Sequence, residues 1–93
     1  MIRVYNMADC PRCRTLEARL ETFGFDFETM YMPSAEGMTE LRMAGVFTLS
    51  APVLQIDDRF YEMEDLFDEF ALKVGFEKRG DKVLVFGPDG KEL

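Results

Sequence analysis

The spacing of apolar positions along the chain predicts seven elements in the order strand, helix, strand, helix, strand, strand, helix. Runs of β-branched and aromatic residues indicate the strands, and apolar residues three to four positions apart indicate the helices. Glycine, proline and aspartate separate these runs. The expected strands are residues 1–5, 25–32, 52–56 and 59–61, and the expected helices are residues 11–23, 34–43 and 63–74.

Two of the expected helices have a clear apolar stripe. The stripe of the first is followed by Gly24, and that of the third by Gly75, and glycine commonly ends a helix. The third helix has the most regular pattern in the chain and begins with acidic residues, which suit the positive end of a helix. The stripes are Cys13, Leu16, Leu20 and Phe23 in the first helix, and Met63, Leu66, Phe67, Phe70, Ala71 and Val74 in the third.

The middle helix and the tail depend on more local signals. Ser34 can cap the middle helix, although Gly37 inside it weakens the pattern. In the tail, Gly80-Asp81 lies between two apolar runs and predicts a hairpin with a glycine-first, II′-type turn. We expect one domain over residues 1–93, with a core at 1–75 and a C-terminal β extension at 76–93 that can add an edge strand.

Composition and charge narrow the range of functions. The chain has 93 residues, 47% of them hydrophobic, which is enough for one domain with a core that needs no cross-links. It has no apolar run of about 20 residues, and Arg3 and Asp9 come too early for a secretory signal, so we expect a cytoplasmic protein with no membrane span. A net charge of −7 argues against nucleic acid and anionic membrane as partners. We expect a monomer.

The two cysteines, Cys10 and Cys13, are the main candidates for chemistry. A disulfide that closes so short a loop adds little stability, which favours a working redox pair over a structural cross-link. Pro11 suits the first position of a helix, which makes Cys10 the capping residue. A thiolate there would face the N–H groups of Arg12 and Cys13, and such sites lower a cysteine pKa from about 8.5 to roughly 3.5–7.5. We therefore predict Cys10 as the exposed nucleophile and Cys13 as the resolving cysteine.

Two hypotheses other than a redox pair stay open for this protein, a metal site and an interaction domain. The chain has no histidine and no third cysteine, so a closed zinc site would need carboxylates or a second chain. Met7 beside the two cysteines suits a soft metal such as Cu(I), and two chains could share an iron–sulfur cluster. The third reading is a redox-inactive interaction domain, to which seven methionines would give an adaptable surface. The redox pair is favoured, with no bound metal or cofactor.

Three short motifs, in this order and spacing, resemble the glutaredoxin branch of the thioredoxin fold over residues 1–75. The resemblance implies a three-layer α/β/α fold with a mixed four-stranded sheet, and a small thiol–disulfide oxidoreductase that carries electrons to protein disulfides. It also implies a cis Pro52 against the dithiol, with Pro11 and Arg12 beside the substrate and the Ala51 backbone paired with an extended substrate chain. The motifs are Cys10-Pro11-Arg12-Cys13, Ser50-Ala51-Pro52-Val53 and Glu64-Asp65-Leu66.

Departures from the glutaredoxin pattern bear on the electron source. Ala8 stands where glutathione-dependent members usually carry a basic residue, and Glu62-Met63 stands where they have Gly-Gly, which should disfavour glutathione. The Ala51-Pro52-Val53 triplet is similar to that of redoxins that serve ribonucleotide reductase and are recharged by a thioredoxin-type reductase. Those redoxins tend to carry an aromatic-Ser-Gly-Phe run where this chain has Tyr61-Glu62-Met63-Glu64. The expected substrate is a disulfide-containing protein, with ribonucleotide reductase among the candidates. The expected electron source is either a thioredoxin-type reductase or glutathione.

Overall fold

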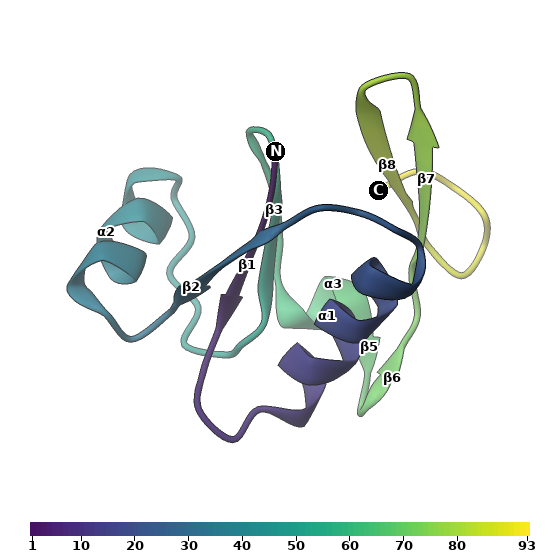
Figure 1. Ribbon diagram of the computed structural model, residues 1–93. Helices are drawn as coiled ribbons and strands as arrows, with labels where there is room; N and C mark the ends of the chain where they lie inside the picture. The colour runs from purple at the N-terminus through teal and green to yellow at the C-terminus, as the bar shows by residue number, and fades with distance from the viewer.

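A four-stranded mixed sheet forms the centre of the molecule in the computed structural model, which describes residues 1–93 (Figure 1). The strand order is β2-β1-β3-β4, with β1 parallel to β2 and antiparallel to β3, and β3 antiparallel to β4. The strands are β1 (Ile2–Asn6), β2 (Glu28–Tyr31), β3 (Val53–Ile56) and β4 (Arg59–Tyr61). All four predicted strands are confirmed, and only β2 is much shorter than its predicted range.

Helices α1 (Pro11–Thr22) and α2 (Ala35–Met43) cover opposite faces of this sheet. Alternation along the strands decides the faces, because successive side chains of a strand point to opposite sides. Val4 packs in one buried cluster with Leu16 and Leu20 of α1, whereas its neighbour Tyr5 packs in a second cluster with Leu41 of α2. The sheet therefore lies between two helical layers, as predicted, and Figure 1 shows α2 on one side and α1 on the other.

The caps predicted for the first two helices are both present. Cys10 caps α1 with Pro11 in the first helical position. Ser34 caps α2, where its Oγ accepts a hydrogen bond from the Gly37 N–H at 2.9 Å. The prediction that Gly37 weakens α2 missed its packing, because Gly37 is buried and a Cβ there would lie 2.5 Å from the Tyr31 carbonyl oxygen.

The predicted third helix over residues 63–74 is wrong beyond its first turn. Helix α3 spans only Met63–Leu66 and is followed by a small hairpin of β5 (Phe67–Asp68) and β6 (Ala71–Leu72). Phe67 already has an extended backbone, and Glu69 at the hairpin tip has a φ of +54°. That left-handed conformation is incompatible with continuing an α-helix. None of the three helices has the length and the apolar character needed to cross a lipid bilayer.

A second apolar pattern explains why the helix stops. Leu72, Val74 and Phe76 recur at every second position, the period of a strand, with Lys73 and Gly75 between them. Val74 is buried in the same cluster as α1, and Leu72 and Phe76 pack against that cluster. A helix would have turned Phe70 inward, whereas the hairpin leaves Phe70 65% exposed.

The tail forms the predicted hairpin from β7 (Gly75–Arg79) and β8 (Lys82–Phe86). Gly80 has a φ of +64° and Asp81 does not share this left-handed conformation, which fits the predicted glycine-first turn. The hairpin is a separate two-stranded sheet and adds no edge strand to the main sheet. Val83 and Val85 belong to the α1-side cluster, so the tail is part of the core packing.

Candidate functional site

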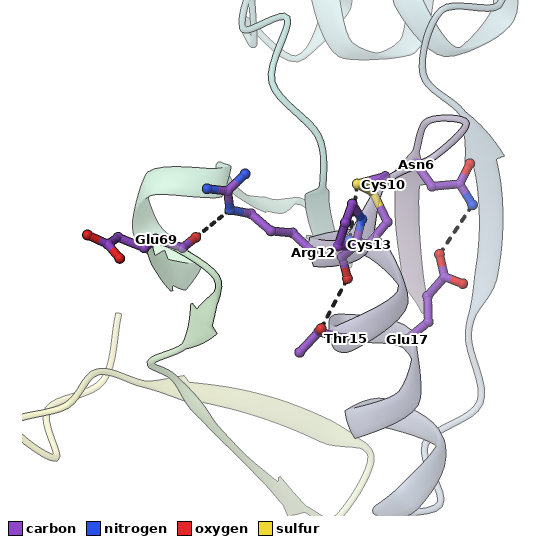
Figure 2. Close-up of a disulfide and its surroundings, with 8 residues drawn as sticks. Asn6, Cys10, Arg12, Cys13, Thr15, Glu17 and Glu69 are labelled. Carbon is purple, nitrogen blue, oxygen red and sulfur yellow. Dashed lines mark hydrogen bonds between the residues drawn. A yellow bond between two sulfur atoms is a disulfide. The ribbon is translucent and has the colours of Figure 1, made fainter.

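Cys10 and Cys13 are joined by a disulfide at the N-terminus of α1, with their Cα atoms 5.2 Å apart (Figure 2). Cys10 has the extended backbone of a cap residue, at φ −112° and ψ 96°, and Pro11 begins the helix. The Cys13 N–H donates a hydrogen bond to the Cys10 Sγ at 3.1 Å. Of the two donors predicted for this sulfur, Cys13 supplies one, and the Arg12 N–H makes no such bond. The Cys10 sulfur therefore lies where the first N–H groups of the helix point.

The two cysteines differ in exposure. Cys13 is 2% exposed, whereas Cys10 is only partly buried and lines an open groove of about 270 Å³ that Cys13 does not reach. An incoming sulfur atom can therefore approach Cys10 but not Cys13. The groove is lined by Met7, Ala8, Asp9, Cys10, Pro11, Arg12, Leu49, Ser50, Ala51 and Met63.

Sheet register brings the proline motif to the dithiol. Tyr5, near the end of β1, pairs with Val53, the first residue of β3, in an antiparallel ladder. The chain leaving β1 toward Cys10 and the chain entering β3 from Ala51 therefore lie at the same edge of the sheet. The Ala51–Pro52 peptide bond is cis, as the resemblance implies. Ala51 lines the groove, whereas Pro52 is fully buried and does not line it.

One hydrogen bond and one backbone conformation shape the turn that carries Cys10 between β1 and α1. The Asn6 side-chain amide donates to a Glu17 carboxylate oxygen at 3.2 Å, which ties the end of β1 to the second turn of α1 (Figure 2). Asp9 adopts a φ of +51°, a left-handed conformation that aspartate tolerates better than most residues. The turn into the helix therefore depends on Asp9 as well as on Pro11.

Arg12, predicted to lie beside the substrate, is held by the β5–β6 hairpin. Its Nε donates to the Glu69 backbone oxygen, and its guanidinium carbon lies 4.3 Å from the centre of the Phe70 ring. Figure 2 shows the Arg12 side chain extended toward Glu69 and away from the Cys10 sulfur. Arg12 therefore lines the groove as a residue, while its charge is held at the hairpin tip.

Several residues of this site lie in segments whose sequence pattern predicts a connection or a core-facing stripe. Met7 and Leu49 lie in the loops at the ends of β1 and before β3, and Met63 begins α3. Phe70 was assigned to an inward helical stripe and instead stacks on Arg12. The available signal was the presence of large apolar residues in loops that adjoin the dithiol and the proline motif.

The groups with shifted pKa values lie outside the groove. Hydrogen bonding of its side chain with Tyr5 and then with Glu28 raises the pKa of Arg3. Burial raises the pKa of Tyr61, and a hydrogen bond from the N-terminal ammonium lowers that of Asp57. The charged residues that line the groove are Asp9 and Arg12, and the end of α1 adds its partial positive charge.

The structure contains no group of three or more His, Cys, Asp or Glu side chains close enough to hold a metal ion. The dithiol supplies two soft ligands, so a metal site there would need further ligands from another molecule. Comparison of the chain with models of protein families, with curated proteins and with solved structures finds no match. The function is therefore inferred from the geometry of the groove, and the resemblance to glutaredoxins stays a prediction.

Proposed function

We propose that the protein is a thioredoxin-like thiol–disulfide oxidoreductase that reduces protein disulfides through Cys10 and Cys13. The observation that supports this proposal is the asymmetry of the pair. The Cys10 sulfur lies in an open groove at a helix N-terminus, and the buried Cys13 follows one turn behind it. This arrangement separates the attacking sulfur from the one that releases the product.

The reduction proceeds in two exchanges. The Cys10 thiolate attacks one sulfur of the substrate disulfide, and the second substrate sulfur leaves as a thiolate and takes up a proton. Cys13 then loses its proton and attacks the Cys10 Sγ, which forms the intramolecular disulfide and releases the first substrate sulfur as a thiol. The substrate gains two electrons and two protons, and the dithiol loses them. The disulfide in the structure is the oxidised state of this cycle.

A partner must return the two electrons. Met63 lines the groove at the position where glutathione-dependent proteins carry glycine, and the carboxylate of Asp9 lines it too. Bulk and negative charge both disfavour the glutathione backbone and its carboxylates. We therefore favour a thioredoxin-type reductase as the electron source and a disulfide-bearing protein, such as ribonucleotide reductase, as the substrate in the cytoplasm. The protein would act as a monomer.

The matched substitutions Cys10→Ser and Cys13→Ser test the proposal, because both remove the same disulfide. Cys10→Ser should abolish reduction of a model protein disulfide such as that of insulin. Cys13→Ser should instead accumulate a mixed disulfide through Cys10, detected as a mass increase that a reductant reverses. Equal activity of Cys10→Ser and native protein would contradict the proposal.

Supplying the two electron sources separately resolves the second part. We expect turnover with NADPH and a thioredoxin reductase, and much slower turnover with NADPH, glutathione reductase and glutathione. The reverse order would show that Met63 does not exclude glutathione. In the expected order, the variant Met63→Gly should raise turnover with glutathione, because it removes the side chain that lines the groove.

A further inference from the structure

An apolar cavity of about 170 Å³ opens next to the dithiol groove, on the α2 side of the sheet. Its walls come from the ends of β1 and β2, from α2 and from the loop that leads to β3. An engineered cavity of similar size, about 150 Å³, holds a benzene molecule, so this one has room for a large apolar side chain. Its apolar lining residues are Met7, Met32, Met38, Leu41, Val46, Phe47 and Leu49.

The cavity adjoins the dithiol groove. Met7 and Leu49 line both of them. Phe47 and Leu49 are 72% and 78% exposed, although both are large apolar residues on the loop before β3. Exposed apolar residues that border a concavity are typical of interaction sites. A chain bound along Cys10 and Ala51 can therefore place a neighbouring side chain in the cavity without leaving the surface.

Arg42 is the one charged residue that lines the cavity. Its side chain makes no ion pair and no hydrogen bond, in a chain whose acidic residues outnumber its basic ones 18 to 11. An unpaired guanidinium beside an apolar cavity is complementary to an apolar residue next to a carboxylate. A lysine at that place in the partner would meet the guanidinium instead and be disfavoured.

We propose that this cavity is the specificity subsite for the protein substrate. It takes one large apolar side chain close to the reactive cysteine of the substrate, and Arg42 binds an acidic residue beside that side chain. The inference rests on the proposed function, because it assigns the cavity to a segment of the disulfide-bearing partner. The α2 side of the groove would then select the protein substrate, and Cys10 at the start of α1 would carry out the disulfide exchange.

The test uses peptides with one cysteine in a disulfide with thionitrobenzoate, which colours the solution when the reduced protein displaces it. A dipeptide unit, Phe-Glu, Phe-Lys, Ala-Glu or Ala-Lys, is placed at several spacings on either side of that cysteine. We expect the Phe peptides to react about tenfold faster than the Ala peptides at the spacing that reaches the cavity. A Glu beside the apolar residue should add about threefold over Lys.

Exposed residues supply matched variants. Arg42→Glu should reverse the preference for Glu over Lys, whereas Arg19→Glu, with the same charge change at the far end of α1, should leave it intact. Phe47→Ala should lower the preference for Phe at least threefold, whereas Phe23→Ala, at the C-terminal cap of α1, should not. All four variants should keep the reaction rate with free dithiobis-nitrobenzoate, because none of these residues lines the dithiol groove.

The outcomes separate this inference from the proposed function. Equal rates for all peptides with a reactive Cys10 would overturn the subsite and leave the oxidoreductase in place. No displacement of thionitrobenzoate from any peptide would overturn both. A dimer that dissociates in Phe47→Ala, with no peptide preference in native protein, would assign the cavity to a second copy of the chain and overturn the proposal.

Discussion

The two faces of the central sheet differ in how completely they are covered. On the α1 face, a cluster of 12 buried residues is closed by α1, α3 and both C-terminal hairpins. On the α2 face, the cluster has 5 buried residues and is covered by α2 and by Val46 of the loop that follows it. Met43, Phe47 and Leu49 remain largely exposed around α2 and its following loop. Burial, and with it most of the hydrophobic stabilisation, is therefore concentrated on the α1 face.

The dithiol lies between these two regions. Cys13 is buried on α1, the helix of the well-covered α1 face, and Cys10 lines the groove that adjoins the cavity on the less covered α2 face. A closed face can hold the helix N-terminus rigidly, and an open one can accept a partner. We therefore expect the α1 face to position the sulfur atoms and the α2 face to select the substrate.

The largest effect is expected from a pair of core truncations, one on each face. Leu20→Ala on the α1 face should lower the free energy of unfolding by about 4 kcal/mol, because Leu20 is fully buried in the larger cluster. Leu41→Ala on the α2 face should cost about 2 kcal/mol, because Leu41 borders the open cavity and water or neighbouring side chains can fill the space. Urea denaturation of the oxidised proteins measures both values.

Equal losses in this pair would remove the contrast between the faces, and a larger loss for Leu41→Ala would reverse it. The Leu41 variant also enlarges the proposed subsite. Its preference for an aromatic over a smaller apolar side chain in the substrate peptide should therefore rise, whereas Leu20→Ala should leave the preference unchanged.

A smaller effect is expected where the closed face reaches the dithiol, at the contact of Phe70 with Arg12. Phe70→Ala should cost about 0.5–1 kcal/mol of stability, since it removes an exposed cation–π contact. It should also release the guanidinium, which can then approach the reduced Cys10 and stabilise its thiolate. We expect the pKa of Cys10 to fall, measured from thiolate absorbance against pH.

The double variant with Arg12→Ala is the control for this contact. In the Arg12→Ala background, Phe70→Ala should not change the pKa of Cys10, because the charge that it releases is gone. A rise of that pKa in Phe70→Ala alone would mean that the hairpin holds Arg12 where it helps the thiolate, opposite to the geometry of Figure 2.

Local patterns predicted most of the fold correctly because tertiary contacts agree with them. Proline at the first position and a cap before it placed α1, and Ser34 placed α2. The segment after Leu66 failed because it satisfies two periods at once, that of a helix and that of a strand. Packing against α1, which no local pattern contains, decides in favour of the hairpin.

At the site, too, local patterns identified what lies close in sequence and missed what tertiary packing brings together. Spacing alone identified Cys10 and Cys13 and their order along the helix, and the structure shows the difference in exposure on which their assigned roles depend. The cavity near Arg42 was missed because its walls come from four separate segments, and residues 46–50 show no period of their own. The hydrogen bond that holds Arg12 joins it to Glu69, 57 positions away, and depends on the β5–β6 hairpin that the pattern did not predict.

The smallest effect is expected in the pH dependence of stability, to which Tyr61 contributes on the α1 face and which should change when its hydroxyl is removed. Burial raises the pKa of Tyr61, which lies in the α1-side cluster, so the folded state favours its neutral phenol. A raised folded-state pKa contributes stability below the unfolded value of 10.0, and this contribution is lost as the pH rises through the folded value. Tyr61→Phe should therefore lose less stability than native protein between about pH 8 and pH 11 in urea titrations.

Tyr31→Phe, at an exposed strand position, is the control and should follow native protein. If Tyr61→Phe lost as much stability as native protein over that range, the burial of its hydroxyl on the closed face would have no energetic consequence.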